Sequence, residues 1–206
     1  MTSAGPAGRR VRVHSATPMD HNHLEDVAQR WLNSLQQDLK DFLHVVCDDQ
    51  DLPDAVRTQA IAAVLYTLAP GDVVPDSSGV IGYLDDALAL RVALDAVRTA
   101  APERFEAIRA RAPELAASLD GDLSAFREAL GDVYEPFCGR VLSGDRVEFK
   151  GKRASDLLDV EGAAWLDEEI SVAALKLDFK PAAVQAAARR ANTIVPTFRQ
   201  KLAPRR

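Results

Sequence analysis

The chain has 206 residues, of which 47% are hydrophobic and 27% are charged, so it can bury a sizeable core as one domain or two small ones. Its formal net charge of −6 argues against general nucleic-acid binding, which needs a basic face to neutralise phosphates. Cys47 and Cys138 lie far apart and form no CxxC pair, so we expect reduced thiols rather than a disulfide scaffold or a zinc knuckle.

Residues 1–19 are predicted to be a disordered tail, because their Gly, Pro, Ser and Ala content cannot bury enough apolar surface to offset the entropy of ordering. This stretch also lacks the apolar run that a signal peptide requires. The longest apolar run of the chain, 60–69, is about 10 residues and falls short of the roughly 20 that span a bilayer. We therefore expect a soluble, cytoplasmic protein.

Four helices are predicted in the first half of the chain. Apolar residues advance by threes and fours over 20–47, as one face of an amphipathic helix requires. A polar connection follows, and Pro53 suits the first turn of a second helix that runs to Leu68. A third helix is predicted over 82–99 and a short fourth helix over 103–111.

The stretch 113–141 keeps helical spacing and predicts one long helix. Gly121 lies between two aspartates and could instead divide this helix in two, because Asp-Gly is a strong break signal. Pro136 is predicted to kink or end the helix, since proline lacks the amide donor and clashes with the preceding turn.

The last part of the chain contains the one stretch with strand-like alternation, 143–155. It is predicted to be a loop, with a small hairpin around Gly151 as the alternative. Helix is predicted again over 154–177 and over 181–202, where Pro196 should interrupt the last helix near its end.

These elements predict an all-α fold, a soluble multi-helix bundle built around a helical hairpin. We expect the tail 1–19 to be followed by a helical core region, 20–112. A helical C-terminal region, 113–206, is expected to pack on this core as one domain.

The other helices are expected to support the stretch 60–90, in which two apolar segments flank a loop. Pro70 and Gly71 stop the first segment, because proline disfavours helix in the residue before it and glycine accepts the conformations that follow a helix end. The loop and the start of the next segment carry four carboxylates: Asp72, Asp76, Asp85 and Asp86.

The motif of this stretch reads Tyr66-x-x-x-Pro70-x-Asp72-x-x-Pro75-Asp76, followed by Gly82-Tyr83-Leu84-Asp85-Asp86. It resembles the signature of the YkvA-like bacterial proteins, a family defined by a domain of unknown function. Many members read like a pair of membrane-embedded helices, so the resemblance alone suggests membrane association, although this chain is more polar around the motif. The resemblance supplies no reaction, and it marks these motif residues as binding candidates: Tyr66, Pro70, Asp72, Pro75, Asp76, Gly82, Tyr83, Asp85 and Asp86.

The aspartates support two interpretations. Four carboxylates gathered at one end of a hairpin are ligands that Mg²⁺, Mn²⁺ or Ca²⁺ prefers. The interpretation that we favour is structural: Asp72 and Asp76 accept hydrogen bonds from loop amides, while Asp85 and Asp86 favour the positive end of a helix dipole. Tyr66 and Tyr83 bracket the loop and are expected to tie it to the bundle through their hydroxyls.

Common catalytic motifs for phosphate, dinucleotide, hydrolase and zinc-protease sites are missing from the sequence. His44 and Cys47 form a weak candidate dyad, since Cys47 fits equally well as a small apolar residue near a helix end. We predict a non-enzymatic protein-interaction or scaffolding module with an unknown protein partner or self-association, without a cofactor or nucleic acid. The alternative is a divalent-metal-binding protein or metal-dependent enzyme that uses the aspartate loop.

Overall fold

The computed structural model describes residues 21–70, 73–143 and 146–202. Within these ranges the protein is helical except for its connections and one pair of two-residue strands, so the all-α prediction is confirmed. The predicted disordered tail lies outside the described residues, and so does Asp72. No described helix is both long and apolar enough to cross a membrane.

The helices predicted for the first half of the chain are present, with ends shifted by a few residues. The first of them continues into one π-helical turn, Leu43–Cys47, and Pro102 occupies the first turn of the fourth, where its missing amide donor costs nothing. Their bounds are α1 (His21–Phe42), α2 (Asp54–Leu68), α3 (Leu84–Ala100) and α4 (Pro102–Arg111).

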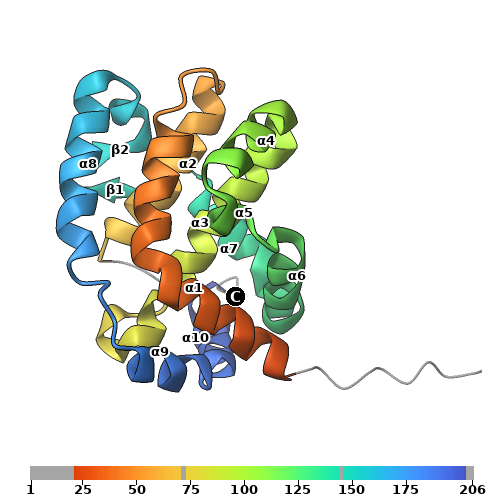
Figure 1. The fold of residues 1–206 in the computed structure, drawn as a ribbon. Helices are drawn as coiled ribbons and strands as arrows, with labels where there is room; N and C mark the ends of the chain where they lie inside the picture. The colour runs from red at the N-terminus through yellow and green to blue at the C-terminus, as the bar shows by residue number, and fades with distance from the viewer. Residues whose placement is uncertain (1–20, 71–72, 144–145, 203–206) are drawn as a thin grey trace, which may run out of the picture.

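The hairpin of α2 and α3 lies at the centre of the protein. Their apolar residues are buried on several sides of each helix rather than along one stripe. α3 contacts α1, α2, α4, α6 and α7, and α2 contacts α7 and α8. Figure 1 shows α8 along one side of the bundle, α4 to α6 on the opposite side, and α9 and α10 across one end. The helices around the hairpin therefore form its shell.

The prediction of one long helix over 113–141 is wrong, and so is the alternative of a break at Gly121. The chain breaks at Ser118, which has φ 56°, and at Gly131, which has φ 59°; Gly121 lies inside the first turn of the middle helix. Pro136 lies in the first turn of the last helix, where proline is tolerated, and so does not kink it. The three helices are α5 (Pro113–Ala116), α6 (Leu119–Leu130) and α7 (Tyr134–Val141).

A small hairpin is present around Gly151, where a loop was predicted and a hairpin was the alternative. Strands β1 (Glu148–Phe149) and β2 (Lys152–Arg153) pair antiparallel. Lys150 and Gly151 turn the chain with φ 49° and 78°, a left-handed conformation that glycine adopts readily.

The last region is divided more than predicted. The helix predicted over 181–202 is broken at Arg189 and Arg190 rather than at Pro196. Pro196 is instead the second residue of the last helix. The elements are η5 (Ala154–Leu157), α8 (Val160–Ala174), α9 (Pro181–Ala188), η6 (Ala191–Ile194) and α10 (Val195–Leu202). Buried apolar residues from both 20–112 and 113–206 belong to one cluster, while the boundary between these regions stays a prediction.

A buried ion pair joins α1 to α3. A guanidinium nitrogen of Arg91 donates to Asp38 Oδ2, and both side chains are almost fully buried. Ser34 Oγ donates to the same carboxylate over 2.5 Å. The Arg91 guanidinium also lies 5.0 Å from the ring centroid of Trp31, which stacks on Phe126 of α6 at 4.8 Å. The pair is therefore packed against an aromatic contact that reaches a third helix.

Candidate functional site

The motif loop leaves α2 abruptly. Ala69 is extended, with ψ 138°, as expected for the residue before Pro70. Pro75 is also extended and precedes η2 (Asp76–Ser78). Gly79, with φ 81°, then connects η2 to η3 (Val80–Tyr83), which leads into α3. The two prolines and the glycine thus determine where the chain turns from one helix to the next.

Tyr66 and Asp85 hold this loop from the inside. The Tyr66 hydroxyl donates to Asp85 Oδ2 over 2.7 Å. The amide of Val73 donates to the Tyr66 hydroxyl over 3.0 Å, and the amide of Val74 donates to Asp85 Oδ2 over 2.9 Å. All four residues are buried. We call this arrangement the Tyr66–Asp85 clamp, because it fastens the loop backbone to both helices.

Burial determines the ionisation of the clamp. It raises the pKa of Asp85 to about 6, although the hydrogen bonds from Val74 and Tyr66 act in the opposite direction. Asp85 Oδ1 is buried and has no hydrogen-bond donor among the described residues, which adds to the difficulty of ionising the group. Burial, followed by the charge of Asp85, also raises the pKa of Tyr66. The tyrosine therefore stays protonated and donates its hydrogen bond.

Gly82 makes the closest backbone contact of the loop. A Cβ at this position would lie 2.6 Å from the carbonyl oxygen of Pro75 and 2.9 Å from Asp76 Cα, so only glycine fits. The amides of Ser78 and Gly79 donate to the backbone carbonyls of Pro75 and Asp76 over 2.8 and 3.0 Å. The structural interpretation predicted that loop amides donate to the Asp76 carboxylate. These two loop amides donate to backbone carbonyls instead.

Asp76 and Asp86 line one small cavity of about 70 Å³ together with Tyr83 and Lys176. Partial burial raises the pKa of Asp76, and the positive charge of Lys176 opposes this shift. The Tyr83 ring packs against Phe179, with centroids 5.1 Å apart. The cavity thus already contains a cationic side chain of the protein beside two of the candidate carboxylates.

The structure separates the aspartates that the metal interpretation grouped. Asp85 faces Tyr66 and Val74, Asp76 and Asp86 share the small cavity, and Asp72 lies outside the described residues. Across 21–70, 73–143 and 146–202, no three His, Cys, Asp or Glu side chains are grouped so that they could hold a metal ion.

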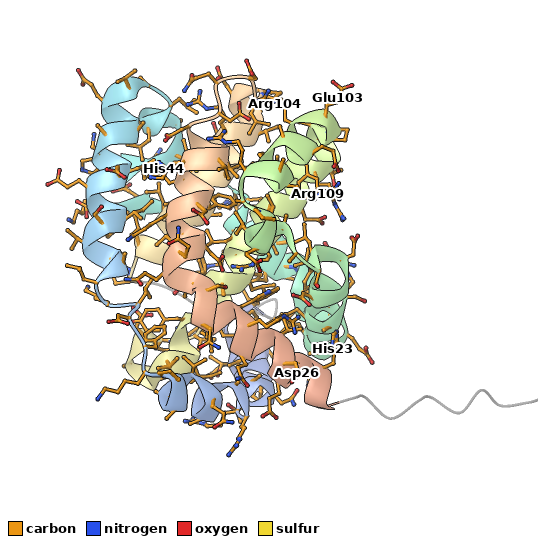
Figure 2. The ribbon with its side chains drawn as sticks, viewed as in Figure 1. His23, Asp26, His44, Glu103, Arg104 and Arg109 are labelled. Atoms are coloured by element: carbon orange, nitrogen blue, oxygen red, sulfur yellow. The ribbon has the colours of Figure 1, made fainter. Side chains whose placement is uncertain are left out.

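The candidate dyad of His44 and Cys47 is not assembled for catalysis. Burial raises the pKa of the Cys47 thiol, so it stays protonated. His44 lies in the π-helical turn after α1, on the side that faces α8 (Figure 2), and its ring nitrogens are 3.4 Å from Asp48 and 3.9 Å from Asp167. Cys47 is therefore a buried apolar residue, as its alternative interpretation had it.

Arg57 is a buried group that the sequence analysis missed. Its guanidinium donates to the carbonyl oxygens of Cys47 over 3.2 Å and Leu158 over 2.9 Å, and so joins the end of the π-helical turn to the start of α8. A lone arginine beside the apolar run of α2 was the available signal, since a charge in such a position must find partners when it is buried.

Comparison with known families gives one match. A family model described as a protein of unknown function, DUF1232, matches residues 56–91. These residues comprise most of α2, the motif loop and the first part of α3, so the match coincides with the central hairpin. The hairpin is thus detected as a domain of unknown function, while the narrower YkvA-like resemblance stays a prediction. Comparisons with curated proteins and with solved structures gave no match.

Gly82→Ala should destabilise the protein by about 1 to 3 kcal/mol, the usual cost of forcing an extra carbon into a packed site. Gly121→Ala is the matched control, because a Cβ there meets no atom within 4 Å; it should be neutral or stabilise α6 by up to about 1 kcal/mol. Urea unfolding of both variants and wild type measures these changes. Equal stability of the two variants would contradict the close contact at Gly82.

Asp85→Asn should change how stability depends on pH. The folded pKa of Asp85, about 6, exceeds its unfolded value of about 3.9. Protonated Asp85 therefore stabilises the folded protein fully below about pH 4, and this stabilisation is lost as the pH rises through about 6. Relative to wild type, the variant should gain on the order of 2 kcal/mol between pH 4 and pH 7. Urea unfolding at several pH values tests this; a constant difference between the two proteins would contradict it.

Proposed function

We propose that this protein is a non-enzymatic helical module that works by binding another protein chain. In this proposal the motif is the structural centre of the module rather than a reactive site. The reactive groups of the clamp, the Tyr66 hydroxyl and Asp85 Oδ2, already bond to each other and to loop amides inside the core. They are therefore engaged in holding the loop and do not face solvent.

The observation that carries the proposal is an apolar stripe on α8. Among the described residues, the large apolar side chains that are exposed are Val160, Val172 and Leu175, with exposed fractions of 84%, 55% and 79%. All three lie on α8 or directly after it. Together with the exposed residue Ala164 they lie on the outward side of the helix, where the exposed Glu168 stands between Ala164 and Val172. The opposite face packs inward through Leu166, Ile170 and Ala174. Apolar side chains exposed together in this way are typical of interaction sites.

The negative charge of α8 indicates which kind of partner surface would complement it. α8 contains four acidic residues and no basic one, so a complementary surface would combine apolar and basic side chains. The chain has a basic surface of its own: residues 180–202 contain no Asp or Glu, and their cations are exposed at Lys180, Arg189, Arg190, Arg199 and Lys201. The proposal therefore includes both a separate basic partner protein and self-association through these two surfaces.

A photo-crosslinking residue, benzoylphenylalanine, in place of Ala164 should give a crosslinked protein adduct in extracts of the native cell or, for self-association, a dimer of the purified chain. The same residue in place of Glu128 on α6, which is also exposed, is the matched control and should give much less product. Adding Val172→Asp and Leu175→Asp should abolish the adduct with a stability change within about 0.5 kcal/mol, because both sites are exposed. Equal labelling at 164 and 128, or an adduct unaffected by the two aspartates, would contradict the proposal.

The metal alternative is separated from this proposal by thermal melts of Asp85 variants. If the clamp is structural, Asp85→Ala should cost about 1 to 3 kcal/mol, since it leaves the buried Val74 amide and the Tyr66 hydroxyl without their acceptor. Asp85→Asn should cost less because its amide oxygen can still accept, and millimolar Mg²⁺ or Ca²⁺ should leave the melting temperature unchanged. A bound ion predicts the opposite: Asn and Ala equally damaging, and wild type stabilised by the ion.

A further inference from the structure

A second, larger cavity is lined in part by Tyr66. Its volume is about 680 Å³, within the range of about 300 to 1,000 Å³ that is typical of small-molecule sites. The end of α2, α7 and the segment leading into β1 form its walls. Its lining includes Tyr66, Ala69, Pro136, Arg140, Arg146 and Val147. The cavity is thus lined by apolar residues and by two arginines, Arg140 and Arg146.

The charge around this cavity favours an anion. Glu148 is the acidic residue among its described lining residues, and its carboxylate lies 3.7 Å from Arg153 Nε, which offsets its charge. Within the described part of the chain, the exposed guanidinium of Arg146 makes no ion pair or side-chain hydrogen bond. A guanidinium bonds carboxylate, phosphate and sulfonate oxygens in pairs. Arg146 therefore supplies a charged donor at the wall of a ligand-sized cavity.

Gly139 of α7 also lines this cavity. Neither its backbone conformation nor its packing requires a glycine at this position. Its φ is not positive, and a Cβ at this position would meet no atom within 4 Å. Glycine inside a helix costs about 0.5 to 1 kcal/mol relative to alanine. At Gly82, by contrast, close backbone contacts require the glycine. Between Pro136 and Arg140, Gly139 therefore leaves one position of the α7 wall without a side chain.

We propose that this cavity binds a small organic anion, with its anionic group on Arg146 and its apolar body against Pro136, Val147 and the Tyr66 ring. This site is independent of the α8 surface, because no residue of α8 lines it. The proposal for the cavity and the proposal for the α8 surface can therefore be tested separately, and either one can be contradicted without the other.

Anilinonaphthalene sulfonate is a suitable probe, because it is an aromatic anion whose fluorescence rises in an apolar site. Titration into the wild-type protein should show saturable binding. Arg146→Gln should weaken this binding by about 5- to 10-fold, the effect of losing one charge-assisted contact. N-phenylnaphthylamine, the uncharged counterpart of the probe, should bind wild type and Arg146→Gln equally. Arg199→Gln, which removes an exposed arginine of α10, is the matched control and should bind the probe like wild type.

Gly139→Trp should fill the cavity and abolish probe binding, while Gly121→Trp on α6 should leave it unchanged. If Gly139→Trp lowers the melting temperature, the Arg146→Gln and Arg199→Gln pair still decides the question. Probe binding that survives in both Gly139→Trp and Arg146→Gln would overturn the proposal. Binding that disappears in Val172→Asp/Leu175→Asp would also overturn it, by placing the probe on the α8 stripe.

Displacement of the probe distinguishes two sources of the anionic group. Octanoate offers a carboxylate on an aliphatic chain, and phenyl phosphate offers a phosphate on a ring, whereas octanol and phenol keep the apolar bodies without the charge. Displacement by either anion, with its neutral counterpart at least about 5-fold weaker, would support the proposal and identify the preferred group. Equal displacement by anions and neutral compounds, or by none of them, would overturn it.

Discussion

The carboxylate of Asp85 is the group on which the geometry of the central hairpin depends. A buried carboxylate is costly unless hydrogen bonds compensate it, and here the donors are the Tyr66 hydroxyl and the Val74 amide. These donors come from the last turn of α2 and from the loop, while the acceptor is in the first turn of α3. One side chain therefore joins three consecutive segments. With the close contact at Gly82, it fixes the angle at which α3 returns along α2.

The helices around the hairpin are held in register by a second set of polar contacts. Arg91 of α3 pairs with Asp38 of α1 inside the core, and Trp31 of α1 donates to Asp122 of α6 over 3.1 Å. Removing one partner of such a buried pair leaves an uncompensated charge, whereas an apolar replacement of both partners can be nearly neutral. We interpret these contacts as fixing which residues of α1 face α3 and α6, since apolar packing alone would permit neighbouring registers.

The burial of the hairpin explains why the proposed binding surfaces lie around it. Most side chains of α2 and of the first part of α3 are buried, so they have little surface to offer a partner. The apolar stripe on α8 belongs to the shell. The cavity beside Tyr66 lies where the end of α2 meets that shell, against α7 and β1. In this arrangement the hairpin positions the shell, and the shell presents the chemistry.

The sequence alone determined the features that depend on neighbouring residues. Helices α1 to α4 follow from apolar spacing and from the prolines at their ends, and Pro70 ends α2 through the backbone preference it imposes on the residue before it. The tertiary structure decided the rest. The breaks at Ser118 and Gly131 were hidden, because the apolar spacing of 113–141 continues through them while the chain bends to bring Phe126 onto Trp31 and Phe137 against Tyr66. The partners of the buried charges also could not be predicted, since Tyr66 and Asp85 are 19 residues apart and Asp38 and Arg91 are 53 apart. Local spacing shows which face of a helix is apolar, but only packing decides which other helix meets it.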